Sequence, residues 1–574
     1  MTDIKPGTAE NKKNIIIYLT LIVLLGIIVY LNSLPNLFVW DDIALIKRNF
    51  LIKDPANLVK IFTQPMGAGF INVPADNNIY AFFRPLQSLS FMIDYSVWGL
   101  NPAGYHMTNL VFHILSAICL FWLVLLLVKD SLAAFICSLL FVVHPALTEA
   151  VDYVSGRADP MGLCFILLSL IFYILYTETG KNKWLAGILC AYPLALLSKE
   201  TSLMLIAILG LYHFCVKKRI RPAAACTYLC LTLGYLFFRF IVSGQYRPEN
   251  SFFGDIPARL PGFFAALANY LRLIFIPANL HMDYGNRIFP VSNPAVITGI
   301  IISLVLLALL YRKHKDPVIS FSLGWFFLTL MPVSNIFYPL PFYMSEHYLY
   351  LPIIGVLIPL SVFLSRLLRN KNARRPVFVG LAAVIVIFAS LTMRQNLVWN
   401  NGVSLFENSL KYSPKSAKLY FLLGLSYKDK ADMAGAKTAF LKSIHLDPGY
   451  DLPYNSLAII YMSEGNFDKS EKTFRALLKI NPDYYLAYYN LGLIYTYQKG
   501  HEKEAIDNFD KCLELNPHCA MAHYELAKIY YYTAKPEKAL FHFRAIDDLG
   551  LKIDPKLFKY LEQKISAESS PANN

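Results

Sequence analysis

The chain has 574 residues, of which 56% are hydrophobic and only 16% are charged. This balance excludes an ordinary soluble globular protein and predicts a chain that sits in lipid. The formal net charge is +14, but from Asn400 onward 22 Lys and Arg stand against 21 Asp and Glu. The excess therefore belongs to the apolar part, where it indicates membrane topology and contact with anionic lipid, and argues against nucleic acid as a partner.

Apolar segments occur throughout residues 1–399. A spanning helix needs about 17 to 25 such residues, and several nearly charge-free segments approach that length: residues 15–31, 110–128, 161–176, 297–311 and 377–393. Counting all apolar segments predicts about eleven spans. No signal-peptidase site follows the first one, so we expect an uncleaved anchor.

Seven of the nine cysteines lie in apolar segments and the other two follow no disulfide framework, so we expect free thiols.

Short basic loops predict the orientation of these spans. Lys and Arg occupy every second loop, as the positive-inside rule requires of cytoplasmic connections. The alternation holds only if residues 260–276, which Asn269 and Arg272 interrupt, form an interfacial or re-entrant helix on the outer side. The N-terminus is then cytoplasmic, and both a large loop at residues 39–105 and the C-terminal domain are extracytoplasmic.

The C-terminal domain, residues 400–574, contains an internal repeat. Pro414, Pro448, Pro482 and Pro517 recur at spacings of 34, 34 and 35 residues, and 34 is the period of the tetratricopeptide repeat. The predicted repeats are residues 415–448, 449–482, 483–517 and 518–551. The fold class is therefore all-α: a polytopic helical membrane bundle followed by a tetratricopeptide α-solenoid. A scaffold for assembly and a groove that presents a polypeptide both fit such an array.

Polar residues are costly at membrane borders, so a cluster of them on one side is a candidate functional site. The predicted outer side has acidic and basic residues where several spans end, and no cytoplasmic loop has comparable acidic content. These candidates are Asp41, Asp42, Arg84, His144, Glu149, Arg157, Asp159, Lys199, Glu200, Glu346 and His347.

Several of these residues stand in runs that resemble a known family. The runs are Trp-Asp-Asp at 40–42, His-Pro-Ala-Leu-Thr-Glu-Ala-Val at 144–151, Gly-Arg-Ala-Asp at 156–159, Ser-Lys-Glu-Thr at 198–201 and Glu-His-Tyr-Leu-Tyr-Leu-Pro at 346–352. Together with C-terminal repeats, they are similar to those of the transmembrane and tetratricopeptide-repeat-containing O-mannosyltransferases and their bacterial relatives. The resemblance covers essentially the whole chain and implies the GT-C glycosyltransferase fold.

The resemblance also implies a reaction. Such enzymes use a polyprenyl-phosphate sugar, and an acidic residue in the first external loop deprotonates the acceptor hydroxyl. Asp41 or Asp42 is the expected general base, with Asp41 favoured. Arg84, Arg157 or Lys199 is expected to bind the departing phosphate. His144, Glu149, Asp159, Glu200, Glu346 and His347 complete the expected substrate-binding set.

Structural roles compete with these catalytic ones. An Asp-Asp pair just after a helix is often a solvated cap, and His144 can cap the helix that follows it. Arg157 can pair with Asp159 to satisfy a buried loop, and Lys199 and Glu200 can do likewise. No cofactor is certain. A divalent cation remains open, because Asp41, Asp42, Glu149, Asp159 and Glu346 offer oxygen ligands but the sequence does not group them.

Three functions follow as hypotheses. The first is transfer of a hexose, by resemblance mannose, from polyprenyl phosphate to a protein hydroxyl. The second is a lipid-linked-sugar transferase that acts on a glycan acceptor, in which the repeats bind partner proteins. The third is a non-catalytic membrane anchor that displays a tetratricopeptide scaffold. Compact loops favour a bacterial inner membrane with periplasmic repeats over the endoplasmic reticulum.

Overall fold

A computed structural model describes residues 9–565 apart from residues 70–81, 218, 244–255, 286, 338, 341, 499, 550–558 and 564. The secondary-structure elements in the described ranges are all helices. The chain divides into two compact units, residues 1–413 and 414–574. An all-α fold was predicted, and the described residues confirm it.

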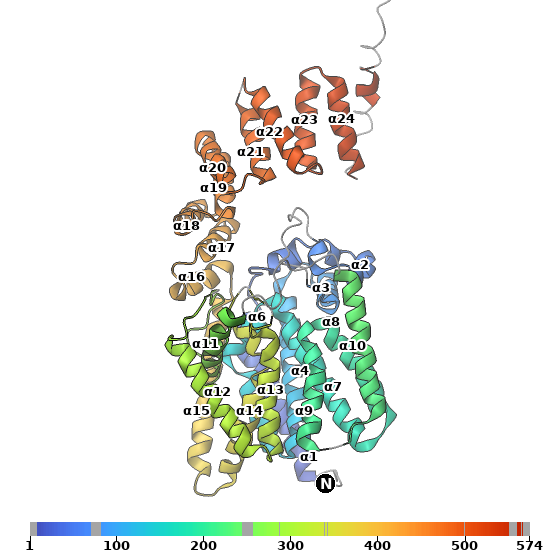
Figure 1. The fold of residues 1–574 in the computed structure, drawn as a ribbon, viewed down its shortest axis with the longest axis vertical. Helices are drawn as coiled ribbons and strands as arrows, with labels where there is room; N and C mark the ends of the chain where they lie inside the picture. Colours follow the sequence, from blue (N-terminus) through green and yellow to red (C-terminus); the bar gives the residue numbers. More distant parts are fainter. Residues whose placement is uncertain are drawn as a thin grey trace, which may run out of the picture. The chain divides into compact units, whose positions relative to one another are not determined.

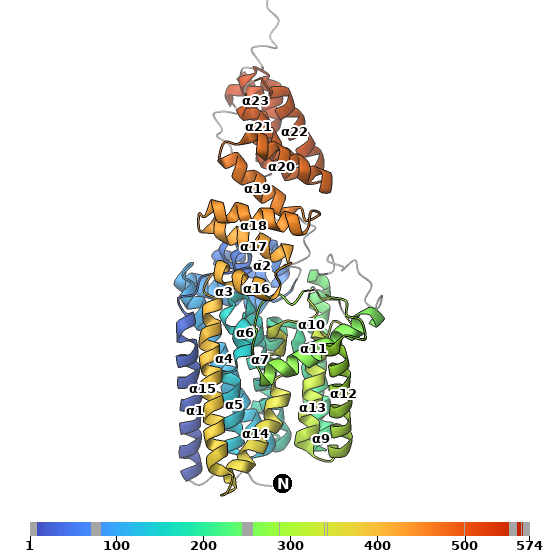
Figure 2. The ribbon, with the colours of Figure 1, turned by 90° about the vertical axis from the view of Figure 1, so that its left-hand side faces the viewer.

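Long helices form the first unit (Figures 1 and 2). By length and composition, six of the described helices can cross a bilayer. They are α1 (Ala9–Tyr30), α4 (Pro102–Val128), α7 (Ala158–Thr179), α10 (Pro222–Ser243), α12 (Pro294–Lys313) and α15 (Arg374–Val398). A seventh span results if α5 (Ser131–Val142) continues through a 60° bend into the segment Pro145–Asp152. These helices support membrane insertion.

Shorter apolar helices lie alongside the long ones (Figure 1). They are α8 (Asn182–Ser198), α9 (Met204–Val216), α13 (Pro317–Leu330) and α14 (Ile354–Arg369). The predicted count of about eleven spans is not confirmed, because length and hydropathy alone do not decide whether these shorter helices cross.

Polar caps set the starts of several of these helices. Asn101, Asn293 and Asp316 each accept a hydrogen bond from a backbone N–H in the first turn, and proline follows each of them directly. Small residues then let helices approach closely. A Cβ on Gly299 of α12 would lie 1.9 Å from the carbonyl oxygen of Phe264 in α11, so this contact requires glycine.

One end of the bundle, which we call the loop end, carries most of the short elements. They are α2 (Leu58–Thr63), α3 (Pro85–Trp98), η7 (Pro145–Leu147), α6 (Thr148–Asp152), η8 (Val154–Arg157), η9 (Glu200–Leu203) and η11 (Glu346–Leu349). Helix α11 (Ile256–Phe275) contains Pro261 and lies obliquely to the long helices in both figures. It is not among the described helices that can cross a bilayer by length and composition, so the non-crossing assignment of residues 260–276 stays a prediction.

Four helix pairs make up the second unit. They are α17 and α18 (Ala417–Asp429, Met433–Leu446), α19 and α20 (Leu452–Ser463, Phe467–Ile480), α21 and α22 (Tyr485–Tyr497, Glu502–Leu515), and α23 and α24 (Ala520–Tyr532, Pro536–Asp548). Gly424 and Gly492 face the rings of Phe440 and Phe509, and a Cβ on either glycine would lie within 2.6 Å of a ring atom. Each small residue therefore lets the two helices of its pair close together.

The division between the units falls after Ser413, whereas the sequence placed it after residue 399. Helix α16 (Gly402–Tyr412) belongs to the first unit. The Asn408 side chain donates to the carbonyl of Leu280 at 3.0 Å, and the Ser413 hydroxyl donates to that of Asp283 at 3.1 Å. These long-range contacts have no local sequence signal. All nine cysteines have free thiols in the structure.

Candidate functional site

The two consecutive aspartates after α1 have different surroundings. Asp42 is fully buried. One of its oxygens accepts from the backbone N–H of Ser155 at 2.8 Å and from its hydroxyl at 2.5 Å, and the other accepts from the N–H of Val39 at 3.1 Å. Burial raises the pKa of Asp42 to about 7, against the lowering effect of these hydrogen bonds. Asp42 therefore fastens the loop to the Ser155 turn.

Asp41 is half-buried and accepts a hydrogen bond from the Tyr153 hydroxyl at 2.8 Å. The ring of Tyr153 stacks on Trp40 at 5.3 Å and on Trp399 at 5.6 Å. Of the two predicted bases, Asp41 is therefore the more accessible to a substrate. Its catalytic role stays a prediction.

Arg84 makes a bidentate ion pair with Glu200, at 3.0 Å from Nε and 2.6 Å from Nη2. The residue before Glu200, Lys199, pairs with Asp159 at 2.5 Å. The structure has neither of the pairings considered as structural alternatives, Arg157 with Asp159 and Lys199 with Glu200, because Lys199 and Glu200 face different partners and Arg157 pairs with Asp94. Neither cation is fully enclosed: the Arg84 side chain is 16% exposed and that of Lys199 9%.

Arg157, by contrast, is completely enclosed. Its Nη2 lies 2.6 Å from Asp94, and its guanidinium also donates to Asn109, to Ser90 and to the carbonyl of Tyr105. All three guanidinium nitrogens therefore have partners inside the protein. This arrangement fits the structural role considered for Arg157, whose guanidinium is enclosed by protein groups.

A second pair of carboxylates lies where α6 meets η11. Glu149 accepts from the backbone N–H of His347 at 2.9 Å, from its ring Nδ1 at 2.8 Å, and from the hydroxyl of Ser345. Glu346 accepts from the N–H of His281 at 2.6 Å and from the Tyr284 hydroxyl at 2.7 Å. Burial and the nearby charge of Glu149 raise the pKa of Glu346 well above its ordinary value.

His144 is buried and serves as a cap. Its Nδ1 accepts from the backbone N–H of Ala146 at 3.3 Å, and its Nε2 lies 2.9 Å from the carbonyl oxygen of Ile274. Both ring nitrogens are thus engaged with the backbone. This geometry agrees with the capping role and gives no support to substrate binding by His144.

Tyr348 lies near charged members of several of these pairs. Its pKa is raised by burial and by the charges of Glu149 and Asp159, and lowered by that of Arg84. Residues 144–159 contribute to every cluster except the Arg84–Glu200 pair. Within this segment, Ser155 binds Asp42 and Tyr153 binds Asp41. The predicted residues therefore gather at the loop end as buried or half-buried clusters. In the described parts of the chain, no three His, Cys, Asp or Glu side chains group closely enough to hold a metal ion.

Sequence reasoning missed the partners that hold the predicted residues. Asp94, Asn109, Tyr153, Ser155 and Tyr284 were not singled out. Tyr153 and Ser155 lie between the two runs at 144–151 and 156–159 that were under consideration, so their position was a usable signal. Asp94 and Asn109 lie on α3 and α4, and only the folded chain brings them to Arg157.

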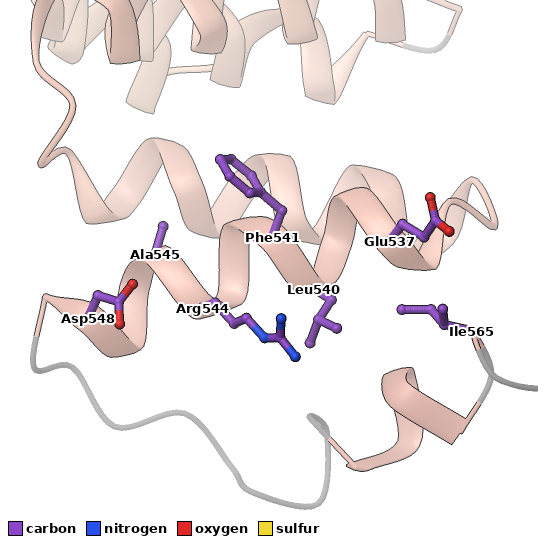
Figure 3. A pocket seen from close by; sticks show the side chains of 7 residues that line it. All are labelled: Glu537, Leu540, Phe541, Arg544, Ala545, Asp548 and Ile565. Carbon is purple, nitrogen blue, oxygen red and sulfur yellow. The ribbon is translucent and has the colours of Figure 1, made fainter.

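The second unit holds a hollow of about 510 Å³ between α24 and Ile565, lined also by Leu540, Phe541 and Arg544. Figure 3 shows the Ile565 side chain directed toward α24 across this hollow. No predicted site residue lines it. It is therefore separate from the clusters at the loop end.

Comparisons with known proteins agree with the recognised pattern. A tetratricopeptide repeat model matches residues 417–450, 453–484 and 485–519, which confirms three predicted repeats; the fourth predicted repeat contains α23 and α24. A protein O-mannosyl-transferase of Caenorhabditis elegans is 27% identical over 460 residues, which cover 78% of this chain and 64% of the relative. Protein O-mannosyl-transferase TMTC3 of Homo sapiens is 25% identical over 480 residues, covering 75% and 51%.

The chain thus spans between about half and two thirds of the length of these relatives. Among solved structures, the crystal structure of MamA overlaps 29% of this chain and 88% of its own, at 20% identity and a TM-score of 0.23. From the curated relatives and the repeat match together, the chain is a homologue of the TMTC-family protein O-mannosyl-transferases and carries tetratricopeptide repeats.

Proposed function

We propose that this protein is a GT-C-type membrane glycosyltransferase that moves a hexose, by resemblance mannose, from a polyprenyl-phosphate donor to a protein hydroxyl on the extracytoplasmic side. The observation that carries the proposal is the half-buried carboxylate of Asp41, held by Tyr153 in the loop that follows α1. The names of the curated relatives support the sugar and the protein acceptor.

Asp41 acts as the general base in this proposal. The acceptor hydroxyl gives its proton to the Asp41 carboxylate while its oxygen bonds to the anomeric carbon. The bond from that carbon to the phosphate oxygen breaks, and its electron pair leaves with the polyprenyl phosphate. A positioned carboxylate contributes about a hundred- to ten-thousandfold to such a step.

Arg84 and Lys199 are the cations best suited to the donor phosphate. Each is bound to one carboxylate and keeps some exposure. A guanidinium binds carboxylate and phosphate oxygens in the same bidentate geometry, so a phosphate can replace Glu200 as the partner of Arg84. Arg157 is less suited, because it is fully buried and paired with Asp94.

The decisive experiment compares Asp41→Asn with Asp42→Asn in full-length protein reconstituted into liposomes. Each is supplied with labelled polyprenyl-phosphate mannose and candidate acceptor proteins. Asp41→Asn should lower transfer at least about a hundredfold while thermal stability and donor binding stay close to wild type. Near wild-type transfer by Asp41→Asn would remove it as the base.

The same assay separates the competing functions. Consumption of donor with label on a glycan acceptor and none on protein would favour the lipid-linked-sugar transferase. No consumption of any polyprenyl-phosphate sugar by the folded protein would favour a membrane anchor that displays its repeats.

A further inference from the structure

Three aromatic rings from separate parts of the first unit form a stack beside Asp41. Trp40 comes from the loop after α1, Tyr153 from the junction of α6 and η8, and Trp399 from the residue that ends α15. The ring centroids are 5.3 Å apart for Trp40 and Tyr153 and 5.6 Å for Tyr153 and Trp399, with interplanar angles of 21° and 26°. Tyr153 is thus the central ring of the stack.

The stack fixes where the Tyr153 hydroxyl points. The side chain is only 8% exposed and Trp399 only 2%, so the tyrosine ring has little freedom to swing out. Its hydroxyl donates to the Asp41 carboxylate at 2.8 Å. Because packing between two larger rings already restricts the tyrosine rotamer, its hydroxyl loses less conformational freedom on binding the carboxylate than that of an unpacked side chain.

The backbone beside Asp41 is held as tightly. Trp40 has φ +51°, in the left-handed region that bulky residues seldom occupy. Such a conformation persists only where the surroundings impose it. Here the Trp40 ring packs on Tyr153, and the Asp42 carboxylate binds Ser155, which is two residues after Tyr153. Both ends of the Trp40–Asp42 segment are therefore fastened to the same turn.

We propose that Tyr153 is the positioning residue for Asp41: its hydroxyl orients the carboxylate and stabilises its charged form, which is the form that accepts the acceptor proton. Trp399 packs on the Tyr153 ring, and Asp42 binds Ser155 and so keeps the loop after α1 next to Tyr153. This inference rests on the proposed function, in which Asp41 is the general base. A hydrogen bond to the charged form of a carboxylate favours that form, so the hydroxyl makes the carboxylate available as a base at lower pH.

The test is Tyr153→Phe in the full-length reconstituted protein, which removes the hydroxyl and keeps a ring in the stack. We measure kcat and KM for transfer from polyprenyl-phosphate mannose between pH 5 and 9. The expected result is a fall in kcat of about tenfold at neutral pH, little change in donor KM, and an acid limb of the pH–rate profile moved to higher pH. The unfolding temperature should stay close to wild type.

Tyr105→Phe is the matched control. Tyr105 is also buried in the first unit, but its hydroxyl donates to the carbonyl of Gly99, away from either aspartate. The Tyr105→Phe variant also loses one buried hydrogen bond, but that bond does not involve Asp41. Its pH–rate profile should therefore equal that of wild type. If Tyr153→Phe also keeps the wild-type profile, the positioning role is overturned. If Tyr153→Phe does not fold, Trp399→Phe provides the test, because a smaller ring loosens the clamp and should move the acid limb in the same direction.

Asp41→Asn in the same assay distinguishes failure of this inference from failure of the proposed function. Loss of transfer in Asp41→Asn together with an unchanged Tyr153→Phe profile rejects only the role of Tyr153. Full transfer in Asp41→Asn rejects Asp41 as the base and this inference with it.

Discussion

Ion pairs differ between the two units of the chain. In the repeat unit they are local and exposed: Arg475 pairs with Glu471 four residues away, and Lys437 with Glu464 on the neighbouring pair of helices. At the loop end of the first unit they are buried or half-buried and join distant segments. Arg84 lies 116 residues from Glu200, and Lys199 lies 40 residues from Asp159.

This difference shows what each unit uses charge for. Exposed ion pairs contribute little to stability, because water and salt screen them. The repeat unit is instead held by local packing such as that of Gly424 on Phe440. Breaking a buried pair leaves an uncompensated charge in a low-dielectric interior, which is strongly destabilising. At the loop end, therefore, charges fix the geometry of the site.

The largest effect is expected from Arg157→Met, which removes the cation buried with Asp94 and keeps most of the side-chain volume. Asp94 would remain as an unpaired carboxylate, and Asn109 would lose a hydrogen-bond donor. We expect the free energy of unfolding to fall by about 3–5 kcal/mol. Denaturant titration of intrinsic fluorescence in detergent measures it.

The double variant Arg157→Met with Asp94→Asn is the control for this interpretation. Removing both charges should recover much of the stability, because no unpaired ion remains. A single variant as stable as wild type would show that the Arg157–Asp94 pair does not hold the loop end together.

The same contrast explains what could be predicted from the sequence. The repeats were predictable because each contact that defines them recurs within one period, as Gly424 with Phe440 and Gly492 with Phe509 do. The apolar helices were predictable from composition over a short window. Both signals are local.

The partners within the site were not predictable, because they are set by tertiary packing. The structure brings several of the candidate residues together, but the pairings considered for Arg157 and Lys199 were with sequence neighbours, since proximity in sequence was the only guide. Their true partners, Asp94 and Asp159, become neighbours only when α3, α7 and η9 pack together. The same reason applies to the unit boundary, which α16 shifts to Ser413 by packing on the 280–285 segment.

A smaller effect is expected from the ionisation of Asp42. Its folded-state pKa of about 7 lies above its ordinary value of 3.8. The folded chain therefore keeps a proton that the unfolded chain releases between about pH 4 and 7. The contribution of Asp42 to stability should fall as the pH rises through this window and then level off.

Asp42→Asn removes this titration. The unfolding temperature of wild type minus that of the variant should increase as the pH is lowered from about 7 to about 4. Thermal scans at matched ionic strength measure it. A difference that is constant over the whole window would show that Asp42 is charged throughout.

Arg84→Ala tests whether Arg84 can exchange Glu200 for the phosphate of the donor substrate. Loss of the guanidinium should raise the KM for polyprenyl-phosphate mannose about tenfold, in line with the loss of one charge-assisted contact of about 1.4 kcal/mol, with a smaller change in kcat. Glu200→Gln is the matched variant, because it releases Arg84 from its carboxylate. Its KM should stay level or fall. Equal increases in both variants would mean that the pair acts only as a structural unit.

The smallest effect is expected from Lys437→Met in the repeat unit, where the ammonium lies 2.7 Å from Glu464 and the two side chains are 30% and 38% exposed. The geometry of this pair is as close as that of Arg157 with Asp94, at 2.6 Å, so a distance alone would predict equal importance. Exposure predicts otherwise, because water solvates both ions when the pair is broken and the lysine regains rotamer freedom. The free energy of unfolding should change by less than about 1 kcal/mol, and the change should shrink further at high salt. Chemical denaturation of the full chain at low and high salt measures the change in unfolding free energy and its salt dependence. Limited proteolysis of the repeats reports the unfolding of the repeat unit. A loss comparable to that of Arg157→Met would break the contrast between the two units, since it would mean that exposed pairs also hold the solenoid together.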